Sequence, residues 1–154
     1  MPSAYATDFL ATEGILKIGA KDSRSAIEAI RRGLPIGALD ELVKSGRLTL
    51  VEIDRIVLPR KTLAYRRKSG VLTPEQSDRL MRVARVIAAA EAIFGSQEKA
   101  SRWLRRSTTA LDGDSPISLL DTSEGCRQIE RLLSMIDYGL SLSARGAVSG
   151  HQFI

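Results

Sequence analysis

The chain has 154 residues, of which 44% are hydrophobic, a proportion that can form a buried core and excludes a wholly disordered protein. No apolar run is long enough to span a bilayer, so a membrane partner is not expected. Cys126 is the single cysteine, which excludes an intramolecular disulfide, and the first eight residues lack the pattern of a signal peptide. These features together predict a cytoplasmic protein.

The net charge of +5 is distributed unevenly along the chain. Residues 55–70 contain six basic side chains and no acid, whereas residues 107–140 contain six acids and only two bases. A basic middle and an acidic end suggest two different partners, and the basic segment favours a nucleic acid.

The N-terminal third of the chain predicts two short helices after a loosely packed start. Residues 1–20 have weak periodicity and are expected to form a weakly ordered N-terminal arm. Residues 21–33 predict a helix with Ile27 on its inward face, ended by a glycine, and residues 34–46 predict a second one with a proline near its first turn.

Two further helices are predicted to follow one another almost without a loop. Thr49 can cap a helix with Glu52 as its capping-box partner, and Pro59 suits the first turn of the next helix, which Gly70 ends. The short connection around Val57 is typical of a helix-turn-helix.

The strongest helix signal begins at Thr73-Pro74 and continues to about Phe94, with a wide apolar face that predicts the central element of the core. A helix capped by Ser96 follows, with Trp103 facing inward. Pro116 starts a short helix, and Ser123 starts the last helix. No segment shows a sustained period of two, so the predicted fold is all-α.

The last residues differ in composition from the rest of the chain. Residues 139–154 are dominated by Gly, Ser and Ala, so residues 141–154 are expected to form a flexible C-terminal arm rather than a packed helix.

The side chains that most enzymes use are scarce in this sequence. Cys126 and His151 are the only cysteine and histidine, so a metal cluster of these residues is not expected. The glycines are scattered as helix stops and form no phosphate-binding loop. No catalytic residue and no cofactor are therefore predicted.

The basic helix is the best candidate for nucleic-acid binding. Leu63 is predicted to face the core, which leaves the basic side chains and Thr62 exposed. Because the N-terminal residues of a recognition helix contact base edges, Arg60 and Lys61 are base-contacting candidates. The other candidates, expected at phosphates or at a thymine methyl, are Thr62, Arg66, Arg67 and Lys68. A merely solvated cationic face is the alternative.

The acidic segment carries several short motifs in a fixed order. They are Ala100 with Trp103-Leu104, Leu-x-Gly-x-x-Pro at 111–116, Leu-Leu-Asp-Thr at 119–122, Glu124-Gly125 and Tyr138-Gly139. This pattern resembles the C-terminal toxin-binding domain of the Xre/MbcA/ParS antitoxin family. Upstream, the sequence LPRKTLAYRRKSGVLTPEQSDRLMRVARV is similar to the Xre-like helix-turn-helix region of that family. The resemblance covers about residues 25–140.

The resemblance implies a helix-turn-helix domain at 21–94 and a toxin-binding domain at 95–140 of a bacterial antitoxin. The partner it implies is a RES-domain or ParT-like toxin that uses NAD, and operator DNA is the second partner. A homodimer or higher assembly is expected because operators of helix-turn-helix proteins mirror a two-fold axis. A free-standing repressor without a toxin is the alternative, and an adaptor that binds no DNA is a third one.

The last helix and the arm, Ser123–Ile154, are expected to block the toxin, with the arm entering or covering its NAD site. A disordered end without a role is the alternative. Acidic side chains would complement a cationic pocket that receives a pyrophosphate. The candidate toxin-binding residues are Asp121, Glu124, Glu130, Tyr138, Arg145, His151, Phe153 and Ile154.

Overall fold

The computed structural model describes the backbone of residues 4–148 and the side chains of residues 9–144. All its regular elements are helical, which confirms the all-α prediction for this part of the chain. The α-helices are α1 (Ala4–Leu16), α2 (Ser23–Arg32), α3 (Ile36–Lys44), α4 (Leu50–Ile56), α5 (Arg60–Ser69), α6 (Pro74–Phe94), α7 (Gln97–Arg105) and α8 (Ser123–Val148). Two short 3-10 helices, η1 (Thr109–Leu111) and η2 (Pro116–Leu119), connect α7 to α8.

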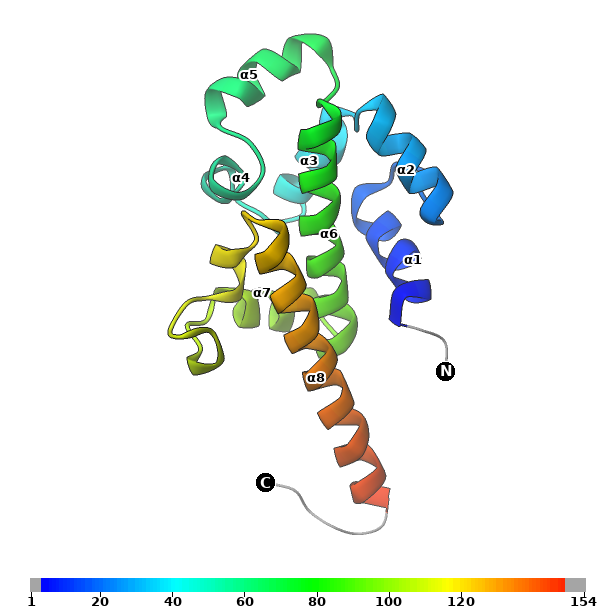
Figure 1. Cartoon of the computed structure of the whole chain (residues 1–154), viewed down its shortest axis with the longest axis vertical. Helices are drawn as coiled ribbons and strands as arrows, with labels where there is room; N and C mark the ends of the chain where they lie inside the picture. The colour runs from blue at the N-terminus through cyan, green and yellow to red at the C-terminus, as the bar shows by residue number, and fades with distance from the viewer. Residues whose placement is uncertain (1–3, 149–154) are drawn as a thin grey trace.

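Helix α6 is the central element, and α1, α2, α7 and α8 all pack against it (Figure 1). It begins where the sequence predicts, with Thr73 and Gln76 forming a capping box and Pro74 in the first turn, and Gly95 ends it. Its buried residues cover most of its circumference: Leu80, Met81, Val83, Ala84, Val86, Ile87, Ala88 and Ala90. Such a helix is stable only when neighbours cover it on several sides.

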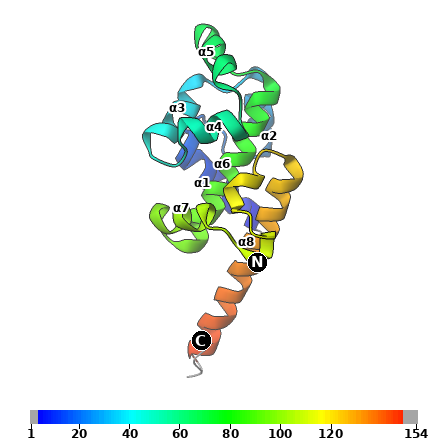
Figure 2. The same cartoon turned by 90° about the vertical axis from the view of Figure 1, so that its left-hand side faces the viewer.

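Helices α4 and α5 form the predicted helix-turn-helix pair, joined by residues 57–59 (Figure 2). Leu63 is the one residue of α5 that is buried, together with Ile53 of α4 and Leu58 of the turn. The carboxylate of Asp54 accepts a hydrogen bond from the Arg60 N–H at 2.7 Å and caps α5, because Pro59 has no side-chain oxygen to do so. Leu63 is therefore the single buried anchor of α5, and most of the other α5 side chains are exposed.

Two backbone hydrogen bonds between the α2–α3 and α5–α6 connections fix the C-terminal end of α5. The Ile36 N–H donates to the Gly70 carbonyl at 3.0 Å, and the Leu72 N–H donates to the Leu34 carbonyl at 2.8 Å. At Gly33, with φ +90°, an added Cβ would lie 2.2 Å from the Leu72 carbonyl oxygen, so only glycine permits this close approach.

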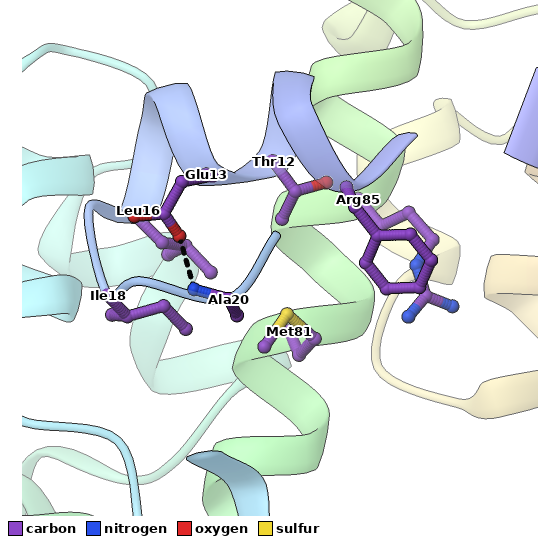
Figure 3. A pocket seen from close by; sticks show the side chains of 8 residues that line it. Thr12, Glu13, Leu16, Ile18, Ala20, Met81 and Arg85 are labelled. Atoms are coloured by element: carbon purple, nitrogen blue, oxygen red, sulfur yellow. Dashed lines mark hydrogen bonds between the residues drawn. The ribbon is translucent and has the colours of Figure 1, made fainter. Parts of the chain in front are cut away.

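The expectation of a weakly ordered N-terminal arm over residues 1–20 is wrong for the residues described. Residues 4–16 form α1, which packs along α6 with Ile15 and Leu16 buried. The sequence shows no helical stripe here because the buried side of α1 also carries Thr12, whose hydroxyl has no hydrogen-bond partner among the described residues. The Glu13 carboxylate accepts hydrogen bonds from the Gly19 and Ala20 N–H groups and so fixes the turn after the helix. Figure 3 shows the bond to Ala20.

The expectation of a flexible arm after residue 140 also needs correction. Helix α8 continues to Val148, beyond the globular body, and residues 140–144 are exposed (Figures 1 and 2). The leucines and alanines of this segment favour helix, and they outweigh the serines and glycines from which a coil was inferred. Ile27 on α2, expected to face inward, is 40% exposed, and Ala29 is buried in its place.

Paired polar groups connect the helix-turn-helix to α7 and α6. Arg105 of α7 binds both carboxylate oxygens of Glu52 of α4, at 3.0 and 2.8 Å, and also donates to the Arg47 carbonyl. Arg47 in turn binds both carboxylate oxygens of Glu91 of α6 at 2.7 and 3.0 Å. These side chains are at most 31% exposed, so water screens the pairs less than surface ion pairs.

The Arg105 pair is expected to stabilise the fold measurably. Arg105→Ala removes a bidentate contact and leaves the half-buried Glu52 carboxylate with its capping role alone. The free energy of unfolding should fall by about 2 kcal/mol, measured by urea denaturation. Arg102→Ala, on the same helix, breaks only an exposed i,i+4 pair with Glu98 and should change stability by less than about 0.5 kcal/mol. Equal effects of the two variants would contradict the connecting role of Arg105.

Candidate functional site

The outward face of α5 is the most strongly basic surface of the helix-turn-helix. Lys61 and Lys68 are exposed, and neither forms an ion pair within the described part of the chain. Arg60 is also exposed, and Thr62 is half-buried. The structure thus brings the predicted DNA-binding side chains together on one helix that projects from the body (Figure 2).

Two of the predicted residues have partners within the protein. Arg67 forms a bidentate pair with Asp40 of α3, at 2.8 and 3.1 Å, and hydrogen bonding to this carboxylate raises the pKa of the guanidinium. The Arg66 Nε donates to the Val71 carbonyl at 3.0 Å. Both guanidiniums therefore attach α5 to the body, a role that the sequence-based assignment to phosphates did not include.

Tyr65 stands between the basic residues and is 67% exposed. The Arg66 guanidinium lies 5.9 Å from the centroid of its ring, within the range of a cation–π contact.

At the other end of the molecule, α7, the two 3-10 helices and α8 form a small hydrophobic layer on α6. Its buried residues are Ala100, Leu104, Leu111, Ile117, Leu120, Cys126, Ile129 and Leu133. The ring of Trp103 packs on that of Phe94 with centroids 5.3 Å apart, so the tryptophan belongs mainly to the core. Burial raises the pKa of the Cys126 thiol, which keeps it protonated and unreactive at neutral pH.

The glycine of the Glu124-Gly125 motif is required by close packing in this layer. A Cβ at this position would lie 1.7 Å from the carbonyl oxygen of Leu119, so the first turn of α8 can lie against η2 only because the residue is glycine. The Gly125 N–H also donates to the Thr122 hydroxyl at 2.9 Å.

The predicted acidic residues lie near the start of α8 and differ in their surroundings. Glu124 binds Arg127 at 2.9 Å and Arg131 at 3.5 Å, so its charge is balanced locally. Asp121 is exposed, and Glu130 is half-buried. The surface of this segment is therefore less acidic than the number of its acidic residues suggests.

The outer half of α8 instead presents an exposed apolar stripe. We define the α8 stripe as Met135, Tyr138 and Leu142, which share one side of the helix and are between 45% and 68% exposed. Leu140 is also exposed but lies on the opposite side of α8. Sequence reasoning named only Tyr138 of the stripe, because the others were read as ordinary helix or arm residues. Arg145 lies on the α8 backbone without a described side chain, and His151, Phe153 and Ile154 lie outside the described residues.

Other kinds of site find no support in the part of the chain that the structure describes. It contains no group of three or more His, Cys, Asp or Glu side chains that could hold a metal ion. Among its helices none is long and apolar enough to cross a membrane. A crevice between α1 and α6, lined in part by Thr12 and Arg85, leaves no room for a water molecule (Figure 3).

The fold and its surfaces define a helix-turn-helix protein with a second helical module built on the same long helix. Residues 25–85 match the Antitoxin Xre-like helix-turn-helix domain, and residues 89–139 match the Antitoxin Xre/MbcA/ParS C-terminal toxin-binding domain. The chain belongs to this antitoxin family, which is not a family of enzymes.

Three relatives support the assignment. An antitoxin Xre of Pseudomonas putida is 41% identical over 68% of this chain and 65% of its own length, slightly under two thirds. An antitoxin Xre of Yersinia enterocolitica is 31% identical over 80% of this chain and 87% of its own length. A Prs ADP-ribosylating antitoxin of Sphingobium is 29% identical over 73% of this chain and 78% of its own length.

Alanine substitutions at two glycines of α8 should have opposite effects. Gly125→Ala forces a backbone shift against Leu119 and should lower the free energy of unfolding by about 1–3 kcal/mol. Gly139→Ala meets nothing within 4 Å and should raise it by up to about 1 kcal/mol, because alanine favours helix. Thermal and urea unfolding of the two variants measures both. A stable Gly125→Ala variant would show that the α8–η2 contact is not close-packed.

Proposed function

We propose that this protein neutralises a partner toxin through its C-terminal domain and represses its own operon by binding DNA through α5. The α8 stripe carries the first half of this proposal. Large apolar side chains gathered on a helix that projects from its own body favour a protein partner that covers them. Part of the stripe lies within the residues that match the toxin-binding domain.

The proposed toxin uses NAD, either as a RES-domain enzyme or as an ADP-ribosyltransferase. The name of the Sphingobium relative, Prs ADP-ribosylating antitoxin, supports an ADP-ribosylating system, whereas the two other relatives carry the name Xre. Residues 141–148 continue α8 beyond the body, and the proposal is that residues 141–154 cover the toxin's NAD site. Arg145, His151, Phe153 and Ile154 are the proposed contacts there, and Asp121, Glu124 and Glu130 lie near the start of α8.

Toxin binding and toxin neutralisation should separate along α8. Met135→Ser removes an apolar side chain from the α8 stripe and should weaken the toxin complex about tenfold to a hundredfold. Deletion of residues 143–154 keeps the whole α8 stripe, so it should leave a complex but abolish neutralisation, since the NAD site would stay open. Co-expression with the product of the adjacent reading frame, followed by size-exclusion chromatography and growth assays, measures both.

Leu10→Ser is the matched control for Met135→Ser, because Leu10 is 64% exposed on α1 and Met135 is 68% exposed. The control should bind the toxin like the unaltered protein. If the truncated protein neutralises fully, inhibition comes from the folded domain alone. If no neighbouring product binds, the protein is a free-standing repressor.

The basic face of α5 supports the DNA-binding half of the proposal. Lys61 and Lys68 are exposed on a projecting helix and are the best-placed cations for phosphates. Arg60 and Thr62 lie on either side of Lys61 at the start of α5, where a recognition helix approaches the bases. A dimer that places two copies of α5 on successive turns of the duplex is part of this proposal.

Loss of two phosphate contacts should be visible in the salt dependence of DNA binding. The double variant Lys61→Ala, Lys68→Ala should reduce the slope of log K against log salt by about 2. Gel shifts on the promoter upstream of the gene, at several salt concentrations, provide the slope. The control Lys21→Ala, Lys99→Ala removes the same charge from other elements and should leave the slope unchanged. Equal slopes in both variants would favour the adaptor alternative.

A further inference from the structure

Tyr65 lies on the outward side of α5. Helical residues turn by about 100° each, so a residue two positions after the buried Leu63 points away from the body. The exposed fractions of the two side chains agree, with Leu63 at 6% and Tyr65 at 67%. Lys61 precedes Tyr65 by four residues and Lys68 follows it by three, so all three side chains lie on one face. We call this face the α5 ridge.

The α5 ridge differs from the face of α5 that was expected to meet DNA. Arg66 and Arg67 are turned toward the body, where they bind the Val71 carbonyl and the Asp40 carboxylate. The two lysines of the ridge have no such partner among the described residues. The outward surface of the helix therefore consists of an aromatic ring between two free ammonium groups.

We propose that Tyr65 contacts a base, in addition to Arg60 and Thr62 at the start of α5, and contributes to its sequence preference, while Lys61 and Lys68 bind phosphates on either side. This inference rests on the proposed DNA binding of α5. The ring would contact the methyl edge of a thymine in the major groove, an apolar contact that distinguishes thymine from the other bases there. The lysines contribute affinity without sequence information, because phosphates are the same at every step.

Charge decides between DNA and a protein as the partner of the α5 ridge. Residues 55–70 carry six bases and no acid, so the segment needs a polyanion to balance it. An exposed tyrosine alone would be unremarkable on a protein surface. Its position between two lysines without an ion pair in the described part of the chain, on the side of α5 opposite Leu63, favours a groove with phosphates on both sides.

The test compares Tyr65→Ala and Tyr65→Phe on two duplexes of equal length, one from the upstream promoter and one of shuffled sequence. Tyr65→Ala should weaken binding to the promoter about tenfold, change binding to the shuffled duplex by less than about twofold, and leave the salt slope unchanged. Tyr65→Phe keeps the ring and should bind the promoter like the unaltered protein. The matched control is Tyr138→Ala, because Tyr138 is 68% exposed on α8 and should not affect DNA binding.

Each contrary outcome has a distinct meaning. Promoter binding that Tyr65→Ala leaves unchanged overturns the inference while DNA binding by α5 stands. An equal loss on both duplexes also overturns it, since Tyr65 would then contribute no preference. If the unaltered protein binds neither duplex, the proposed DNA binding fails and the inference fails with it. Loss of toxin binding in Tyr65→Ala, with DNA binding intact, would identify the α5 ridge as a protein contact.

Discussion

Burial of α6 is the constraint on which the rest of the structure depends. This helix is covered by α1, α2, α7 and α8, and it contains more buried residues than any other helix in the described part of the chain. The match to the helix-turn-helix domain ends at residue 85 and the match to the toxin-binding domain begins at residue 89, both inside α6. One continuous helix thus belongs to both domains, so no flexible linker separates them. The Arg47–Glu91 and Arg105–Glu52 pairs tie α4 to the same unit.

A rigid connection of this kind gives the two proposed surfaces a fixed separation. Helix α5 projects at one end of the molecule and the outer half of α8 projects at the other (Figure 1). Their chemistry also differs, since α5 presents ammonium groups around one aromatic ring and α8 presents apolar side chains without a body beneath them. A polyanion and an apolar protein groove can therefore be bound by the same molecule at the same time, without competing for one surface.

Local signals in the sequence predicted most of the fold, because caps and helix stops act over a few residues. Thr73-Pro74 and Gly95 bound α6 as expected, and Leu63 faces the core as its spacing predicted. Contacts between distant residues could not be predicted in this way. The pairing of Arg67 with Asp40, 27 positions earlier, changes which face of α5 is free. The packing of α1 and the exposed stripe of α8 likewise depend on which other helices cover them. A local sequence pattern does not indicate these neighbours.

The central claim is that one rigid chain holds DNA at α5 and a toxin at α8 simultaneously. The most direct measurement is light scattering, coupled to size-exclusion chromatography, on a mixture of the protein, the product of the adjacent reading frame and the promoter duplex. We expect a single species that contains all three components, because the two surfaces lie at opposite ends of the molecule. Release of the duplex when the toxin binds, or of the toxin when the duplex binds, would contradict this account.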